Sequence, residues 1–321
     1  MTSLLAEESM GSAPQAALSV SVVIPTRDRP EMLRRAVASV LDQDYPGAVE
    51  VVVVQDRPDP DAPEPTFEIE RTDRSVRLLA NHDAPGAAAT RNIGLRAATG
   101  DLVALCDDDD VWLPGKLAAQ VAALQALPAA IGCGTGYVLV QGEQRVQRIP
   151  DVSEMTHQAL LRSRVADVHP SSLVFRRELL IDRVGLLDEQ VPGSYGEDYD
   201  WLLRATTVGP VLALQSPYVE VLWHPGSFFT GQWQVIAEAI SYLLAKHPDF
   251  RSEPQGLARL YGRLAFAYAS LGDRAAARHW ALRTLRVSPK EKRGYVALAA
   301  GLRLLPPATA AKLANARGRG I

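Results

Sequence analysis

Four consecutive aspartates, Asp107, Asp108, Asp109 and Asp110, follow an apolar run and are the residues of this sequence best suited to bind a cation. Adjacent carboxylates repel one another unless a cation neutralises them. Hard divalent cations such as Mg²⁺ are usually held by one or two carboxylates together with substrate phosphates. If the run continues a strand, Asp107 and Asp109 lie on one face of it. The aspartates therefore indicate a metal site, or alternatively an acidic loop that caps the helix expected from about Pro114.

A second acidic pair, Glu197 and Asp198, follows Gly196 and precedes a segment with helical character, residues 199–204. Acidic residues in the first turn of a helix are stabilised by the helix dipole, so this pair can be purely structural. A carboxylate in this position can equally serve as a general base, the group that takes a proton from a reacting hydroxyl. Spacing alone leaves both interpretations open.

Two further features could bind ligands. Residues 86–92 open a predicted helix with small side chains and place Arg91 one turn in, where a phosphate can bind. His224 follows an apolar run and is either a structural histidine or a metal ligand. Neither feature is specific by itself. Whether these residues form a site depends on the strands and helices that position them.

Apolar runs and helical spacing alternate through the first hundred residues. Strands are predicted at residues 19–24, 49–54, 76–80 and 102–106, and helices at residues 30–41 and 86–98. The valine-rich run at 49–54 is typical of a strand buried on both faces of a parallel sheet. This order predicts a doubly wound α/β domain, which binds ligands at the carboxyl ends of its strands. The acidic run and the polar residues at 26–28, 55–56 and 81–83 fall at those ends.

The rest of the chain changes character twice. Residues 131–229 mix strand and helix patterns, and the sequence is helical from there to its end. One tetratricopeptide-like helical hairpin is indicated by the spacing of Leu264, Ala265, Tyr268, Gly272, Ala277 and Pro289. We therefore expect a disordered tail (1–18), an α/β domain (19–230) and a basic α-helical extension (231–321).

Charge is distributed unevenly along the chain. Residues 251–321 hold 14 Lys and Arg against 3 Asp and Glu, a net charge of +11 within an overall charge of −3. Such a segment can contact a membrane surface or a polyanion, or be a solvated helical face. Nucleic acid is not expected as a partner. Two cysteines, no secretory pattern in residues 1–17 and no apolar run long enough for a transmembrane segment predict a cytoplasmic protein, which can be peripheral at the inner face of the membrane.

Several short motifs, taken in order, resemble those of family 2 glycosyltransferases over roughly residues 19–228. They are residues 22–27 (VVIPTR), 39–43 (SVLDQ), 53–56 (VVQD), 88–94 (AATRNIG), 98–101 (ATGD), 105–114 (LCDDDDVWLP) and 196–201 (GEDYDW). The order of the motifs is far more specific than any one of them. The resemblance implies the GT-A fold with a mixed central sheet, and inverting sugar transfer from a nucleotide-sugar with Mn²⁺ or Mg²⁺ as cofactor.

The resemblance also implies roles for individual residues. The donor would be bound by Pro25, Thr26, Arg27, Asp56, Arg91, Asp107 and Asp108, with Asp56 receiving a hydrogen bond from the base. The metal would be held by Asp107, Asp109 and His224. Asp198 would be the general base, with Glu197 beside it holding the acceptor. The acceptor site would include Ser171, Trp201 and Trp223.

Some alternatives stay open. A UDP-sugar is favoured, but residues 55–58 read QDRP where the family usually has two acids and Gly-Ser, which leaves thymidine and guanosine donors open. The acceptor can be a glycan, a lipid-linked molecule or a small molecule. A sugar nucleotidyltransferase normally carries a glycine-rich loop where this chain has PTRD at residues 25–28. A non-catalytic nucleotide-binding scaffold would bind nucleotide without turnover.

Overall fold

The apolar runs of the first hundred residues form the strands that their spacing predicts. The computed structural model of this chain describes residues 17–83, 85–163, 168–223 and 231–304. Its strands are β1 (Val20–Thr26), β2 (Val49–Asp56), β3 (Arg74–Asn81), β4 (Leu102–Leu105), β5 (Val111–Trp112), β6 (Gly132–Gln141), β7 (Gln144–Arg148), β8 (Glu154–Met155), β9 (Val174–Arg176) and β10 (Val211–Leu222).

Helices cover the sheet and continue beyond it. They are α1 (Pro30–Leu41), α2 (Ala87–Ala97), α3 (Lys116–Ala126), α4 (His157–Arg162), α5 (Arg177–Leu179), α6 (Glu197–Val208), α7 (Trp233–Lys246), α8 (Pro254–Ser270), α9 (Arg274–Val287) and α10 (Lys292–Gly301). Short helical turns are η1 (Pro170–Ser172), η2 (Leu180–Val184), η3 (Pro192–Ser194) and η4 (Pro248–Ser252).

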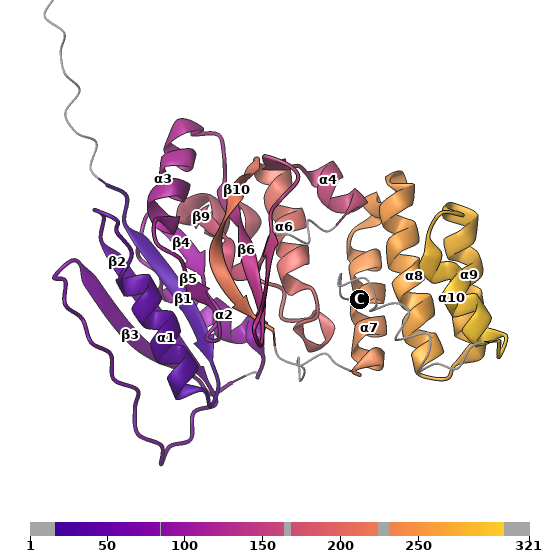
Figure 1. Cartoon of the computed structure of the whole chain (residues 1–321), viewed down its shortest axis with the longest axis horizontal. Coiled ribbons are helices and arrows are strands. Elements are labelled where there is room, and N and C mark those ends of the chain that lie inside the picture. Colours follow the sequence, from indigo (N-terminus) through magenta and orange to yellow (C-terminus); the bar gives the residue numbers. More distant parts are fainter. Residues whose placement is uncertain (1–16, 84, 164–167, 224–230, 305–321) are drawn as a thin grey trace, which may run out of the picture.

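The strands form one twisted sheet of mixed direction (Figure 1). Its order is β3-β2-β1-β4-β9-β6-β10-β5, with β7 beside β6 and β8 beside β10. The strands β3, β2, β1 and β4 are parallel, whereas β9 runs antiparallel to both β4 and β6. The mixed central sheet confirms the expected fold class.

Strand β1 shows how both faces of the sheet are covered. Successive side chains of a strand point to opposite faces. Val22 and Ile24 pack with Leu33 of α1, and Val23 packs with Leu95 of α2. Helices α1 and α2 therefore lie on opposite faces, and both begin where a strand has ended.

Gly94 allows α2 to approach β1 closely. A Cβ atom at Gly94 would stand 2.3 Å from Cγ1 of Val23, far inside the distance at which two carbon atoms pack. Glycine is therefore required for this contact. The approach also brings Arg91, one turn earlier on α2, within reach of the residues that follow β4.

The connection from β2 to β3 departs from the regular alternation of strands and helices. Residues 57–73 form an irregular segment with no helix between these two parallel strands. The segment holds Pro58, Pro60, Pro63 and Pro65. Proline lacks a backbone N–H and clashes with the preceding helical turn, so four prolines in eight residues exclude a helix here.

The C-terminal helices pack against the sheet domain. In Figure 1, α7, α8, α9 and α10 stand side by side beyond α6. Ile240 of α7 and Leu264 of α8 belong to the same buried cluster as Phe175 of β9. The predicted hairpin is present as α8 and α9, with Gly272 at a left-handed φ of 79° in its turn.

Two expectations about the whole chain meet the limits of the described part. The three-part division stays a prediction, because residues 1–16 and 224–230 lie outside the described residues. Within the described ranges, none of the helices is long and apolar enough to cross a membrane. The two cysteines, Cys106 and Cys133, are buried free thiols, as their apolar neighbours predict.

Candidate active site

The acidic run lies in a turn directly after β4, at the carboxyl end of the parallel strands. The backbone N–H of Asp110 donates to the carbonyl of Asp107 over 3.1 Å and closes the turn. The run therefore does not continue the strand. The expectation that Asp107 and Asp109 lie on one face of a strand is wrong, because these residues form a turn. The side chains of the run instead have separate sets of partners.

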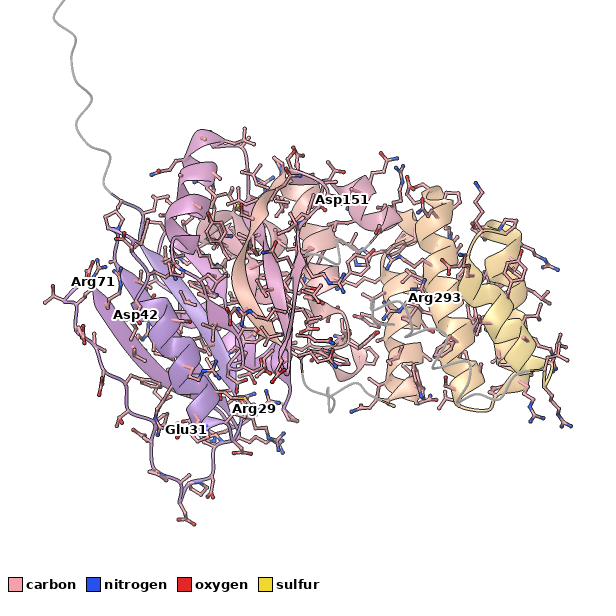
Figure 2. The ribbon with its side chains drawn as sticks, viewed as in Figure 1. Arg29, Glu31, Asp42, Arg71, Asp151 and Arg293 are labelled. Atoms are coloured by element: carbon pink, nitrogen blue, oxygen red, sulfur yellow. The ribbon has the colours of Figure 1, made fainter. Side chains whose placement is uncertain are left out.

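Arg29, the residue before α1, holds the middle of the run. Its Nη1 lies 3.2 Å from Oδ1 of Asp108 and 3.0 Å from Oδ2 of Asp109. The hydroxyl of Thr26, at the end of β1, donates to Asp108 over 2.7 Å. Arg29 is half exposed and lies at the edge of the sheet domain where α1 begins (Figure 2). The positive charge of Arg29 therefore lies beside these two carboxylates on their solvent-facing side.

Arg91 joins the acidic run to the second acidic pair. Its Nη2 donates to Oδ1 of Asp107, and its Nη1 donates to Oε1 of Glu197 over 2.6 Å. Arg91 is only 6% exposed, so its ion pair with Glu197 is shielded from solvent, whereas Asp107 keeps 22% of its side chain exposed. The resemblance implied a role for Arg91 near the donor phosphates. The structure places its guanidinium between two carboxylates.

Glu197 and Asp198 occupy the first turn of α6. Gly196 before them has a φ of 87°, a left-handed conformation that glycine adopts without strain. Both acidic side chains are buried, at 6% and 8% exposure. The positive end of the helix dipole stabilises negative charge at this position. The turn therefore keeps two carboxyl groups in a nearly dry site.

The turn η1 closes the acidic run from another part of the chain. The hydroxyl of Ser171 accepts a hydrogen bond from the N–H of Asp107 over 2.9 Å and donates to Asp110. Nδ1 of His169 lies 3.2 Å from Oδ2 of Asp110. Ligand atoms of Asp107, Asp110 and His169 lie within 4.8 Å of one another. Two carboxylates and an imidazole form a donor set that fits a divalent cation such as Mn²⁺.

The acidity of these groups reflects their crowding. Burial and the charges of Asp110, Asp107 and Asp108 raise the pKa of Asp109 to about 7. Burial also acts to raise the pKa of Asp107, but Arg91 and His169 outweigh it and hold that pKa below its usual value. A carboxyl group that ionises only near neutral pH lacks sufficient positive charge around it, so a bound cation would stabilise its ionised form.

Glu197 and His169 are shifted by the same crowding. Burial raises the pKa of Glu197 to about 7, with Arg91 opposing the shift and Asp198 adding to it. Burial acts to lower the pKa of His169, but Asp110 and Asp107 outweigh it and raise that pKa. A carboxyl group that titrates near neutral pH can either donate or accept a hydrogen bond.

The residues expected at the nucleotide lie at the ends of β1 and β2. Asp56 is buried, and Nδ2 of Asn81 donates to its Oδ1 over 3.2 Å. Nη1 of Arg27 lies 3.9 Å from the other oxygen of Asp56, and the Arg27 side chain is exposed. Pro25 is half-buried beside Thr26. These residues lie at the carboxyl end of the sheet, as the acidic run does, but on the neighbouring strands.

The structure does not bring all the expected acceptor residues to the site. Trp201 is fully buried against Phe175, with ring centres 5.0 Å apart, and its indole N–H donates to the carbonyl of Gly185. Its ring belongs to the core and is closed to an acceptor. Trp223 is 45% exposed at the end of β10. His224 lies outside the described residues.

Ser171 is at the site, but in another capacity. Its side chain is fully buried and is engaged with Asp107 and Asp110. Its hydroxyl holds the acidic turn in place through these two hydrogen bonds. A contact with the acceptor would need its hydroxyl to leave both partners.

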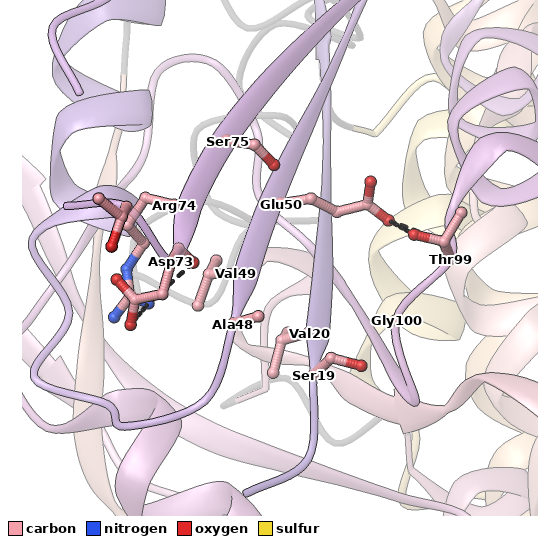
Figure 3. A pocket seen from close by; sticks show the side chains of 11 residues that line it. Ser19, Val20, Ala48, Val49, Glu50, Asp73, Arg74, Ser75, Thr99 and Gly100 are labelled. Atoms are coloured by element: carbon pink, nitrogen blue, oxygen red, sulfur yellow. Dashed lines mark hydrogen bonds and ion pairs between the residues drawn. The ribbon is translucent and has the colours of Figure 1, made fainter.

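A hollow of about 280 Å³ lies at the opposite end of the parallel strands (Figure 3). Glu50, at the start of β2, points there toward Thr99, whose N–H and hydroxyl donate to it over 2.7 and 2.6 Å. Ser21 donates to the same carboxylate oxygen. These hydrogen bonds join the amino ends of the strands, and the hollow contains none of the predicted site residues.

Four residues that contribute to the site were not assigned these roles from the sequence: Arg29, Asn81, Asp110 and His169. Asn81 was noted only among the polar residues that follow a strand, and Asp110 only as the end of the acidic run. Arg29 was not identified at all. A polar residue at the end of each strand is a signal for Asn81, whereas the contacts of His169 depend on a fold that joins distant segments.

Known proteins resemble this chain in sequence. A family model described as Glycosyl transferase family 2 matches residues 21–184. An Escherichia coli relative, the UDP-Glc:alpha-D-GlcNAc-diphosphoundecaprenol beta-1,3-glucosyltransferase WfgD, is 28% identical over 145 residues, covering 45% of this chain and 55% of the relative. The chain spans about half, or less, of the length of the first curated relatives that it matches.

Solved structures share the fold. Staphylococcus aureus TarS 1–349 in complex with UDP-GlcNAc has a TM-score of 0.62 at 18% identity, covering 89% of each chain. The mannosyltransferase PcManGT from Pyrobaculum calidifontis, in complex with GDP-Man and Mn²⁺, has a TM-score of 0.53 at 20% identity, covering 92% of this chain and 83% of that one. At these identities the likeness shows the fold alone.

Proposed function

The chain belongs to the family 2 glycosyltransferases, and from this premise we propose that it transfers a sugar from a nucleoside-diphosphate donor to an acceptor hydroxyl with inversion at the anomeric carbon. The observation that carries the proposal is the double ion pair of Arg91, which links Asp107 to Glu197. Asp107 can then act at the donor diphosphate while Glu197, beside the proposed base Asp198, contacts the acceptor.

Asp198 is the proposed general base. Its carboxylate takes the proton from the acceptor hydroxyl while the hydroxyl oxygen attacks the anomeric carbon. The bond from that carbon to the diphosphate breaks on the opposite face, so the configuration inverts. Glu197, with a pKa of about 7, can hold the acceptor hydroxyl as a donor or an acceptor of a hydrogen bond.

A divalent cation, Mn²⁺ or Mg²⁺, is the proposed cofactor. We assign Asp107, Asp109 and His169 as its ligands. Asp107 and His169 belong to the donor set described above, and Asp109 takes the place of Asp110 because its side chain is 23% exposed whereas that of Asp110 is 1% exposed. Asp110 is buried and orients His169 through Nδ1, as carboxylates commonly do for metal-binding histidines. When bound, the cation would neutralise charge that develops on the leaving diphosphate. His224 remains the alternative histidine ligand.

A UDP-sugar is the favoured donor. Asp56, held by Asn81 and close to Arg27, is proposed to accept a hydrogen bond from the base. The names of the E. coli relative and of the TarS structure contain UDP-Glc and UDP-GlcNAc, and that of PcManGT contains GDP-Man. Guanosine and thymidine donors therefore belong in any test.

Product analysis tests the function. The full chain is incubated with UDP-glucose, UDP-GlcNAc, GDP-mannose or TDP-glucose, each with Mn²⁺ and a polyprenyl-diphosphate-linked or free glycan acceptor. We expect release of the nucleoside diphosphate and a new glycosidic bond. Pyrophosphate release would point to the nucleotidyltransferase instead. Binding without any release would point to the non-catalytic scaffold.

A lipid-linked acceptor is favoured by the name of the E. coli relative and by the basic extension. Residues 251–304 carry 11 Lys and Arg against 3 Asp and Glu. Leu282, Tyr295 and Leu302 are about half exposed on α9, on α10 and just after it. Basic residues with exposed apolar side chains between them are typical of a surface that contacts anionic lipid headgroups.

Vesicle sedimentation tests the membrane contact. We expect the chain to sediment with vesicles that contain an anionic phospholipid and to stay in solution with neutral phosphatidylcholine vesicles. Tyr295→Ser combined with Leu282→Ser should weaken the sedimentation. Equal binding to both kinds of vesicle, or to neither, would contradict this part of the proposal.

A further inference from the structure

The turn that carries Glu197 and Asp198 lacks a local cap. Gly196, at the N-cap, has no side chain with which to bind the first N–H groups of α6. The chain before it is sharply bent, with positive φ angles at Gly193, Ser194 and Gly196. The direction of the two carboxyl groups therefore depends on contacts from outside α6.

The end of α7 holds this turn through Asp200, which is fully buried. Nζ of Lys246 and Nε2 of His247 each lie 2.8 Å from Oδ1 of Asp200, and Nε of Arg204 lies 2.9 Å from its Oδ2. Lys246 also contacts Asp188, which lies before the bend. Because one lysine binds carboxylates on both sides of the bend, α7 fixes the bend and the first turn of α6 together.

Helix α8 holds the same turn at both flanks. Nη2 of Arg263 donates to the hydroxyl of Tyr195, and Nη2 of Arg259 donates to the hydroxyl of Tyr199 over 3.0 Å. The guanidinium carbons lie 5.5 and 5.7 Å from the centres of the two rings, within cation–π range. The two tyrosines flank residues 196–198, and the two arginines stand one turn apart on α8.

Apolar packing brings α7 against the bend. A Cβ atom at Gly193 would lie 2.4 Å from Cγ1 of Val235, so only glycine permits this approach of α7. A Cβ atom at Gly196 would lie 3.4 Å from Leu243. The polar contacts of α7 and α8 therefore act at a surface that is already closely packed.

We infer that α7 and α8 are a positioning element for the turn with Glu197 and Asp198, and that Lys246, His247, Arg259 and Arg263 are its positioning residues. The inference rests on the proposed function, because it gives the helical extension a part in transfer by Asp198. It also accounts for part of the basic charge of the extension. Two arginines of α8 are engaged with tyrosines of the site.

Three variants of the full chain test the inference: Arg259→Met, Arg263→Met and the control Arg283→Met. Arg283 makes the same kind of contact, donating to the hydroxyl of Tyr261 over 3.0 Å, but it lies on α9, away from α6. The readout is nucleoside-diphosphate release from the UDP-sugar that the wild type uses, together with calorimetric affinity for UDP and Mn²⁺. We expect kcat to fall about 10- to 100-fold in the first two variants, with KM and UDP affinity nearly unchanged.

The control and a rescue separate positioning from stability. Arg283→Met should keep kcat even if its Tm falls as much as that of Arg259→Met or Arg263→Met. Arg263→Lys should recover part of the kcat that Arg263→Met loses, because lysine keeps a cation near Tyr195. Unchanged kcat in folded Arg259→Met and Arg263→Met, or an equal loss in Arg283→Met, would overturn the inference.

Hydrogen exchange distinguishes this inference from the proposed function. Amides of residues 192–200 should exchange faster in Arg259→Met and Arg263→Met than in the wild type, and Arg283→Met should leave them unchanged. If the wild type transfers no sugar, the proposed function fails and the exchange rates alone decide the inference. Equal protection of residues 192–200 in all the variants would then overturn it.

Discussion

Arg91 is the residue on which the electrostatics of the site depend. It is buried and faces Asp107 and Glu197, so the Glu197 carboxylate would have almost no access to water if Arg91 were removed. Removing one partner of a buried ion pair costs far more than the pair contributes, because a charge is left uncompensated. The burial of Arg91 predicts that its replacement harms stability and the site together.

Arg91→Met should lower the free energy of unfolding by about 3–5 kcal/mol. Adding Glu197→Gln should recover part of this loss, because it removes one of the two unpaired carboxylates. Urea denaturation of the wild type, both single variants and the double variant measures the coupling. Strictly additive effects would mean that the two side chains do not interact in solution.

Asp198→Asn should leave donor binding intact and remove transfer. The amide keeps the size of the side chain but cannot take a proton, and general-base assistance is worth about 10²–10⁴-fold in rate. Calorimetry with UDP and Mn²⁺, alongside the rate of transfer, checks both halves of this prediction. Lost donor affinity in this variant would count against Asp198 as the base.

Asp109 makes both stability and metal binding depend on pH. Its pKa is about 7 in the folded chain and 3.8 ordinarily, so between these values the folded state holds a proton that the unfolded state has released. The contribution of Asp109 to stability therefore falls as pH rises through this window. A cation needs the ionised carboxylate, so its affinity should rise up to about pH 7 and fall by up to about tenfold per pH unit below it.

Calorimetric titration of Mn²⁺ at pH 5.5, 6.5 and 7.5 tests this pH dependence. Asp109→Asn is the matched control, because it removes the titrating group and should flatten the profile between pH 5.5 and 7.5. An identical slope in wild type and Asp109→Asn would show that another group controls the affinity.

At the scale of elements, the parallel half of the fold follows from the sequence. The residue spacing predicts β1, α1, β2, β3, α2 and β4 within a few residues of their observed bounds. Their strand ends also place the acidic run and Asp56 correctly at one edge of the sheet. Period-two and period-3.6 patterns are local properties, so a single sequence carries them.

The rest of the site depends on pairings that are not local. Strand β9 inserts antiparallel between β4 and β6, and this pairing brings η1 with Ser171 against the acidic turn. No periodicity encodes such a pairing. The burial of Trp201 likewise depends on the packing of α6 against β9, which its place beside Asp198 in the sequence does not reveal.

The contact between α2 and β1 gives a prediction for an element. Gly94→Ala should destabilise the chain by about 1–3 kcal/mol, because the added methyl group overlaps Val23. Val23→Ala leaves room for that methyl group, so the double variant should be more stable than the sum of the single effects predicts. Thermal unfolding of the four proteins gives the coupling. Additive losses would contradict the close approach of α2.

At the scale of the whole molecule, the helical extension packs on the sheet domain and charge is uneven along the chain. Helices α7 and α8 share a buried cluster with the sheet domain, so this part of the basic extension is packed into the same core. On α8, Arg259 contacts Tyr199 of α6 and Arg263 contacts Tyr195 just before it, whereas Leu282 of α9 and Tyr295 of α10 are about half exposed. The extension therefore has two surfaces, for which we propose separate tasks.

The proposed function requires above all that a nucleoside diphosphate and a divalent cation bind together at the acidic turn. A thermal-shift screen of UDP, GDP and TDP, each with and without Mn²⁺ or Mg²⁺, measures this, because a ligand that binds only the folded state raises Tm. We predict that one nucleotide raises Tm only when the metal is present, and that Asp109→Ala abolishes the shift. No shift with any nucleotide and metal, or a shift that Asp109→Ala leaves intact, would contradict the proposed function.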